Sequence, residues 1–266
     1  MGPSHQLYIY QINKLNQDHS EIDTIFIGDS SLGNAINSSL FNSLSGMNSV
    51  NLALSGLYGY AGSYNMIKKA VKRNHIKNVV LVHTLDMVSR PVSYIGYLYS
   101  MNTFSDFYEL KLYEKLNLLE TSINTLFSIN NLKRILLYFF FQNVKKYTID
   151  NDYIKQTKRM KINNTTPKKS IRVNDEKKIF LTKIVHFCKQ YKINLLYLHG
   201  PHLNNIDRRS IMNINKIIQS TGIELIKNIH YLAPDQIGDN TDHVLPSYKN
   251  MITELYYTAL KEKLIY

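Results

Sequence analysis

The chain has 266 residues, of which 44% are hydrophobic, while 11 are glycine and 6 are proline. This composition excludes a disordered or fibrous protein and is sufficient for one buried core. The formal net charge of +12 favours an acidic partner, and residues 133–178 carry most of it, with 13 lysines or arginines against 4 acidic residues.

The first third of the chain alternates between short β-rich runs and stretches of helical periodicity. Strands are predicted over residues 24–28, 49–55 and 78–85, and helices over 32–44 and 58–74. The second helix carries four basic residues in its last turns, where the helix dipole favours cations. The pattern indicates three consecutive strand–helix units.

The same alternation resumes near the end of the chain. It predicts helices over 175–191, 205–220 and 246–264, and strands over 193–198 and 223–229. Parallel strands need crossover connections, and right-handed crossovers place helices on both faces of the sheet. The sequence therefore predicts an α/β fold, a three-layer α/β/α sandwich around five parallel strands.

Residues 88–174 lack this alternation and are interpreted as an insertion in one domain that spans residues 6–266. Helical periodicity over 101–141 predicts a cap, and the basic stretch 144–172 predicts a mobile loop, both overhanging the site. Residues 1–5 resemble the remnant of an expression tag.

Two observations bear on the compartment. The longest apolar run, residues 135–141, covers about a third of the roughly 20 residues that cross a bilayer, so a membrane is expected only through an anchor removed upstream. The single cysteine, Cys188, lies among apolar residues at helical spacing and is predicted to be a core thiol. One cysteine forms no internal disulfide, which is compatible with a cytoplasm and with a bacterial periplasm.

Ligand sites of open parallel sheets lie beyond the carboxyl ends of the strands. The first strand ends in Gly28-Asp29-Ser30-Ser31, which places a hydroxyl at the start of a helix, where free N–H groups stabilise an anion. The same residues also fit a simple helix N-cap. Gly56, after the second strand, would let a backbone N–H approach a substrate oxygen, or would serve only a tight turn.

A histidine precedes the last helix, in the run Asp239-Asn240-Thr241-Asp242-His243. A neutral imidazole accepts a serine proton only if an acceptor holds its other nitrogen, and Asp239 and Asp242 are the candidates. Such Asp-His pairs are also ordinary surface features. His199 and His202 follow the fourth strand and are candidate substrate-binding residues.

Gly28-Asp29-Ser30, Gly56 and His243 together resemble the motifs of the SGNH hydrolase family, also called GDSL. The resemblance implies that Ser30 is the nucleophile and His243 its base, and that the Ser30 and Gly56 amides bind the oxyanion. It also implies a flavodoxin-like strand order.

Two positions depart from the family pattern. His83-Thr84-Leu85-Asp86 stands where the family usually has Gly-x-Asn-Asp, so Thr84 or His83 is expected to supply the third oxyanion donor. Asn240 stands where Asp-x-x-His requires aspartate, which leaves Asp239, the preferred candidate, and Asp242 as partners of His243.

The chain resembles polysaccharide O-acetyltransferases and acetyl esterases of that family. We therefore expect O-acyl, and specifically O-acetyl, transfer or ester hydrolysis on a bacterial surface glycan through an acyl-Ser30 intermediate, in the periplasm or cell envelope. Tyrosines and lysines of the insertion suit an acidic sugar polymer. The alternative is an inactive module of the same fold that binds an anionic polymer. No cofactor, metal or nucleic acid is expected, because no motif for them is present.

Overall fold

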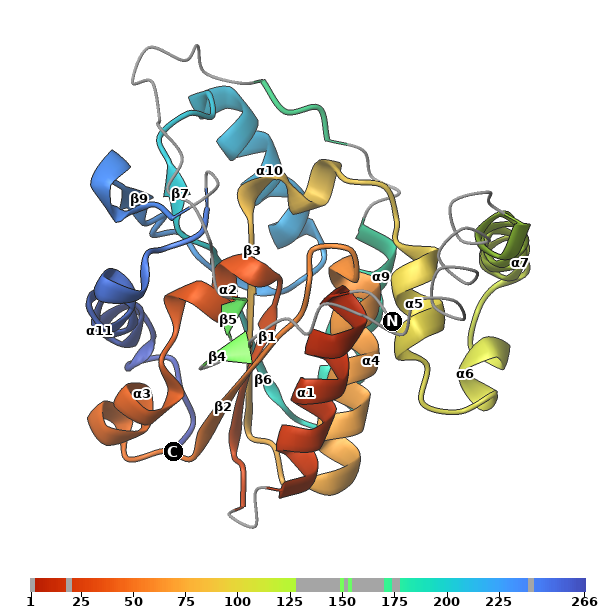
Figure 1. Ribbon diagram of the computed structural model, residues 1–266, viewed down its shortest axis with the longest axis horizontal. Coiled ribbons are helices and arrows are strands. Elements are labelled where there is room, and N and C mark those ends of the chain that lie inside the picture. The colour runs from red at the N-terminus through yellow and green to blue at the C-terminus, as the bar shows by residue number, and fades with distance from the viewer. Residues whose placement is uncertain are drawn as a thin grey trace, which may run out of the picture.

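The computed structural model describes residues 3–17, 21–127, 149–150, 153–154, 170–173, 178–238 and 242–266. Its centre is a parallel sheet with the strand order β2-β1-β3-β6-β8 (Figure 1). The five strands are β1 (Thr24–Gly28), β2 (Ser49–Ala53), β3 (Asn78–His83), β6 (Asn194–His199) and β8 (Glu224–Ile226). This is the flavodoxin-like order, and the prediction of five parallel strands is confirmed.

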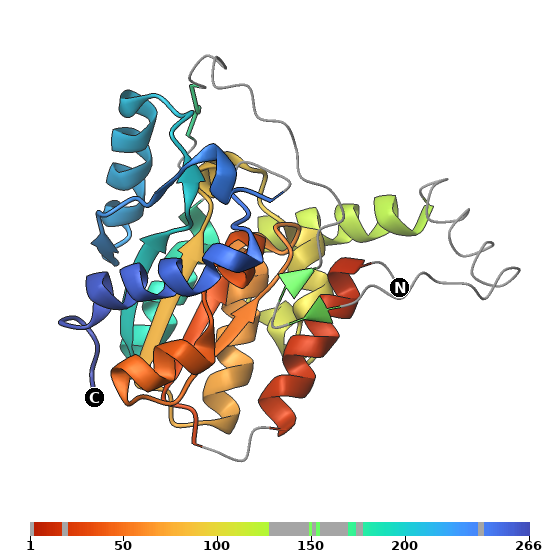
Figure 2. The ribbon, with the colours of Figure 1, turned by 60° about the vertical axis from the view of Figure 1, so that its left-hand side comes forward.

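Helices cover both faces of the sheet (Figures 1 and 2). One layer contains α1 (Pro3–Gln17), α4 (Gly59–Arg73), α9 (Ile179–Gln190) and α10 (Arg208–Ser220). The other layer contains α2 (Ser30–Ala35), α3 (Ser38–Ser45) and α11 (Lys249–Leu260). Side chains alternate along β1, so that Ile25 and Ile27 face the first layer and Phe26 the second. The predicted three-layer sandwich is confirmed.

Between β3 and β6 the chain forms further helices. They are the 3₁₀ helix η1 (Leu85–Ser89), α5 (Tyr94–Ser100), α6 (Ser105–Tyr108) and α7 (Leu112–Phe127). In Figure 1, α5, α6 and α7 lie beside α4 and away from α2, so this part of the expected cap does not overhang the start of α2. Most of the expected loop 144–172 lies outside the described residues.

Small elements complete the described fold. They are the strand pairs β4 (Ile149–Asp150) with β5 (Tyr153–Ile154) and β7 (His202–Leu203) with β9 (Tyr231–Leu232), and the 3₁₀ helices η3 (Pro234–Gln236) and η4 (Pro246–Tyr248). Within the described part of the chain, no helix has the length and apolar character that a membrane span requires.

Helix α1 was not predicted from the sequence, and residues 3–5, set aside as a tag remnant, form its first turn. Its buried side chains Leu7, Tyr8 and Leu15 recur at helical spacing and pack on the core. The predicted helix 32–44 was also only partly right. It is divided into α2 and α3, because Asn37 leaves the helical conformation and its side chain caps α3 by accepting from Leu40 N.

Cys188 is 1% exposed in α9, which confirms the prediction of a core thiol. Burial disfavours the thiolate and raises the pKa of Cys188 to about 12. The thiol therefore behaves as a small apolar side chain that fills the core under α9.

Candidate active site

The end of β1 positions Ser30 at the start of α2. A Cβ atom on Gly28 would lie 1.6 Å from the carbonyl oxygen of Val82, so only glycine allows β1 and β3 to approach this closely. Asp29 caps α2, because its Oδ1 accepts from the Ser31 amide at 3.0 Å and from the Ser31 hydroxyl at 2.6 Å. Ser31 is thereby fully buried, while Ser30 is only partly buried.

His243 lies against Ser30 although 213 residues separate them in sequence, and its Nε2 is 2.8 Å from Ser30 Oγ. An isolated bridge between Ile237 and Val244 and a hydrogen bond from Gly238 N to His243 O fix the chain on both sides of the loop. The imidazole is 17% exposed. The two groups are within the distance needed for proton transfer, and a ligand can reach them.

Asp242 does not lie where a triad carboxylate is needed. Its shortest contact with the imidazole is 3.9 Å, from Oδ1 to Nε2, the nitrogen that already faces Ser30. A carboxylate that orients a catalytic histidine holds the opposite nitrogen, Nδ1. Asp242 is therefore a carboxyl group beside the serine–histidine pair, and the geometry does not support its predicted triad role. Asp239, the preferred candidate, lies outside the described residues.

Burial controls the charge of Asp242. Its side chain is 8% exposed and Oδ1 has no hydrogen-bond partner in the described structure. Burial raises the pKa of Asp242 to about 6; the nearby His243 lowers this pKa, while Asp29 and Asp86 raise it. The carboxyl group consequently titrates close to neutral pH.

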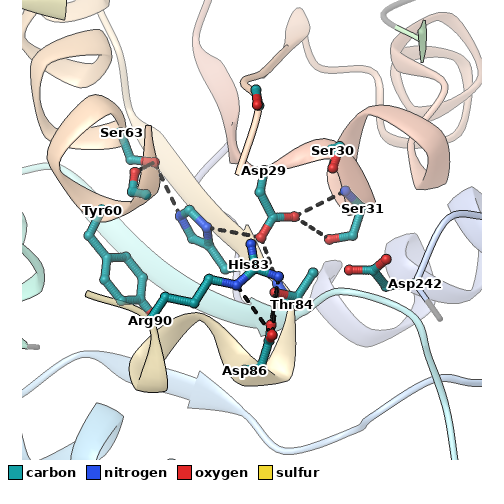
Figure 3. A network of polar contacts seen from close by, with 12 residues as sticks. Asp29, Ser30, Ser31, Tyr60, Ser63, His83, Thr84, Asp86, Arg90 and Asp242 are labelled. Carbon is teal, nitrogen blue, oxygen red and sulfur yellow. Dashed lines mark hydrogen bonds and ion pairs between the residues drawn. The ribbon is translucent and has the colours of Figure 1, made fainter. Parts of the chain in front are cut away.

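A buried polar network lies beneath the serine (Figure 3). Asp29 is 1% exposed, its Oδ2 is 3.5 Å from His83 Nδ1, and His83 Nε2 is 3.1 Å from Ser63 Oγ. Burial alone would raise the pKa of Asp29, but hydrogen bonds and the charge of His83, with Ser31 and the Thr84 amide, lower it well below its ordinary value. Asp29, the residue after β1, is thus a carboxylate that holds the amide of Thr84, the residue after β3.

Thr84 and His83 were the expected sources of a third oxyanion donor. The Thr84 amide donates to Asp29 Oδ2 at 2.9 Å, and the Thr84 hydroxyl donates to Asp86 Oδ1 at 2.7 Å. His83 is fully buried beneath the site. Both donors of Thr84 are therefore engaged, and neither residue is placed to meet a substrate oxygen.

The structure adds two residues that sequence reasoning missed. Arg90 binds Asp86 through Nε and Nη2, at distances of 2.9 to 3.2 Å, and an added Cβ on Gly56 would lie 2.6 Å from Arg90 Nη1. The guanidinium therefore lies beside the glycine expected in the oxyanion hole. A signal was present, since Asp86 and Arg90 stand four residues apart just after the third strand.

The predicted substrate contacts of His199 and His202 are wrong for this conformation, because both side chains are buried, with 0% and 5% exposure. His199 Nε2 is 2.7 Å from Asn215 Oδ1 of α10, and burial lowers the pKa of His199 to about 4. His202 Nδ1 donates to the carbonyl of Leu203. Loop polarity predicted two exposed imidazoles, but both are internal structural groups.

Fold and geometry define an α/β/α protein with a paired serine and histidine at the carboxyl end of a parallel sheet. No protein-family model and no curated protein matches the chain. Among solved structures it is similar to a protein from Desulfitobacterium hafniense DCB-2 that is assigned to the G-D-S-L family of lipolytic proteins, with 10% identity and a TM-score of 0.44, over 90% of this chain and 100% of that chain. A function for this chain therefore has to be derived from the site itself. Among the described residues, no group of three or more potential metal ligands is present.

Proposed function

We propose that this chain is a serine-dependent acyl-transfer enzyme, an esterase or O-acyltransferase that works through an acyl-Ser30 intermediate. The observation that carries the proposal is the 2.8 Å contact between His243 Nε2 and Ser30 Oγ at the carboxyl end of β1. A serine hydroxyl is a weak nucleophile until an adjacent base takes its proton, and this contact supplies the base.

In the proposed reaction, His243 Nε2 accepts the Ser30 proton as Ser30 Oγ attacks an ester carbonyl. The tetrahedral oxyanion accepts hydrogen bonds from the backbone amides of Ser30 and Gly56, neither of which has an acceptor among the described residues. The C–O bond to the alcohol then breaks, and the protonated His243 gives its proton to the departing oxygen. The products are a free alcohol and an acyl-Ser30 ester.

The second half of the reaction repeats these steps with a new acceptor. Water releases a carboxylic acid, whereas a sugar hydroxyl forms a new ester, and in both cases His243 takes the acceptor's proton and returns it to Ser30. His243 must carry its remaining proton on Nδ1 throughout, which requires an acceptor at that nitrogen. Asp239 is our proposed acceptor, since the contact of Asp242 is with Nε2.

We propose an acetyl group as the acyl unit and a glycan hydroxyl as its acceptor, in keeping with the resemblance of the sequence motifs. Exposed aromatic rings are present on α5, α6 and α7 and the loops between them, but these helices lie away from the start of α2, so the rings do not bear on which acceptor reaches Ser30. These rings are Tyr99, Phe104, Tyr108 and Tyr113, with exposures between 41% and 71%. The basic stretch 133–178, on which the alternative of an inactive polymer-binding module depends, lies largely outside the described residues.

Hydrolysis of a chromogenic acetyl ester tests the acyl-serine mechanism. Ser30→Ala and His243→Ala should each lower kcat by roughly 10³-fold or more, because the two residues act as one unit. Ser43→Ala and His75→Ala, which change an exposed serine and an exposed histidine, serve as matched controls, and circular dichroism verifies folding. Equal turnover by wild type and a folded Ser30→Ala variant would refute the proposal.

Product analysis then separates the two acceptors. Mass spectrometry of reactions with and without an oligosaccharide detects sugar acetylation, and a change from acid release to sugar ester identifies a transferase. The alternative function predicts a different response to salt. A polymer binder loses affinity steeply between roughly 50 and 200 mM salt, whereas hydrolysis of a small neutral ester changes little.

A further inference from the structure

The proposed oxyanion hole has two backbone donors and no obvious third one. Both donors of Thr84 are engaged by Asp29 and Asp86, and the chain has no asparagine at the position where the family it resembles carries one. Removing one donor from an oxyanion hole typically lowers kcat by about 10² to 10³-fold. A side chain that replaces the missing donor would therefore matter to the rate.

Arg90 has a guanidinium nitrogen directed to this place. Its Nε and Nη2 bind Asp86, which fixes the plane of the fork. The remaining nitrogen, Nη1, has no hydrogen-bond acceptor in the described part of the chain, and it would lie 2.6 Å from a Cβ atom on Gly56. The glycine at position 56 thus leaves room for a charged donor beside its backbone, and a larger side chain would displace the guanidinium.

The strand order brings this donor to the end of the sheet where the serine lies. Strand β1 is flanked by β2 on one side and β3 on the other. Gly56 follows β2, Asp86 follows β3 and Ser30 follows β1, so a side chain that binds Asp86 and reaches Gly56 crosses the end of β1. Figure 3 shows the guanidinium between Asp86 and the Asp29 carboxylate.

The Arg90 side chain is both ionised and accessible to a ligand. Burial alone would lower the pKa of Arg90, but Asp86, with Asp29 and Asp242, raises it. The side chain is 38% exposed, so a bound substrate can contact it. A guanidinium donor forms a charge-assisted hydrogen bond, which strengthens as negative charge develops on the acceptor oxygen.

We propose that Arg90 Nη1 is the third oxyanion donor and completes the hole formed by the Ser30 and Gly56 amides. The inference depends on the proposed acyl-Ser30 mechanism. Asp86 is a positioning residue, because it holds the guanidinium through two of its nitrogens, and the Thr84 hydroxyl in turn holds Asp86. The residue after β3 thus contributes indirectly, by orienting the side chain that makes the contact.

Kinetics of Arg90→Met and Arg90→Ala on the chromogenic acetyl ester test this role. We expect kcat to fall by about 10² to 10³-fold with little change in KM, because the contact forms only in the transition state. Added guanidinium should restore part of the kcat of Arg90→Ala, whereas a purely structural defect would not respond. Arg73→Ala is the control and should keep the wild-type kcat. Arg73 is an exposed residue at the end of α4, at the opposite end of the strands from the site.

The outcomes distinguish this inference from the proposed function. Wild-type turnover that is lost in Ser30→Ala but retained in Arg90→Met supports the acyl-serine mechanism and overturns the role of Arg90. A fall in kcat that guanidinium does not restore also overturns it. Absence of wild-type turnover overturns both. If Arg90→Met and Arg90→Ala do not fold, Arg90→Lys keeps a cation but loses the fork, and an unchanged kcat in that variant would overturn the role.

Discussion

Replacing Asp242 with asparagine should stabilise the folded protein at neutral pH. The carboxyl group is 8% exposed, its Oδ1 has no hydrogen-bond partner in the described structure, and burial raises its pKa from 3.8 to about 6. The folded state therefore holds the Asp242 proton more tightly than the unfolded state does. The stability that this proton confers is fully present below pH 3.8 and is lost as the pH rises through about 6.

The size of the effect follows from the shift in pKa. A difference of about 2 pKa units corresponds to about 3 kcal/mol, and integration assigns about 2 kcal/mol of it to the interval between pH 4 and pH 7. Asparagine fills nearly the same space and does not titrate. The free energy of unfolding of Asp242→Asn, minus that of the wild type, should therefore increase by about 2 kcal/mol as the pH rises from 4 to 7.

Urea unfolding followed by circular dichroism at several pH values from 4 to 8 measures the effect. Glu254→Gln, which changes an exposed carboxylate on α11, is the control and should give a curve parallel to the wild type. If the wild type and Asp242→Asn have parallel curves as well, the carboxyl group does not carry the proton that its burial implies. The explanation of its raised pKa would then be wrong.

Three further results are expected. Cys188 should react with a thiol reagent at pH 8 only after denaturation, since the thiol is buried and its pKa is about 12; rapid reaction of the native protein would contradict its burial. Gly200→Ala should lower the free energy of unfolding by about 1 to 3 kcal/mol in urea, because the new Cβ would lie 2.3 Å from the Ser31 hydroxyl; a neutral effect would mean that this hydroxyl moves freely. Lys183→Met should destabilise the fold by roughly 3 kcal/mol in the same assay, because it leaves the fully buried Glu114 without its ion pair, and adding Glu114→Gln should restore most of the loss. Failure of the second change to help would show that the aliphatic stem of Lys183 matters more than its charge.

The sheet could be predicted because burial leaves a direct mark on sequence. Val79–Val82 is a continuous apolar run, and a strand covered by helices on both faces requires such a run. The same rule located the carboxyl ends of the strands. The sequence pattern alone therefore predicts that Ser30 and His243 lie at the same end of the sheet.

The side chains around that pair could not be predicted from linear motifs alone. Arg90 matters because its guanidinium crosses from one strand end to another, and this crossing depends on strand order and on a glycine 34 residues earlier. The error at His199 has a local reason. It is the last residue of β6 and points to the same face as Tyr197, beneath α10, so alternation along the strand predicts burial where loop polarity predicted exposure.

Helix α1 has a further consequence, for association between molecules. Strand β2 forms one border of the sheet, and Leu54 N donates to Gly28 O of β1, so the carbonyls of Asn51 and Ala53 point away from β1. Gln11 Nε2 and Lys14 Nζ of α1 donate to these two carbonyls at 2.9 and 3.2 Å. An unprotected border strand offers such groups to the backbone of another chain and promotes aggregation. Two side chains of α1 occupy them instead, so this helix protects the sheet against intermolecular pairing in addition to covering the core.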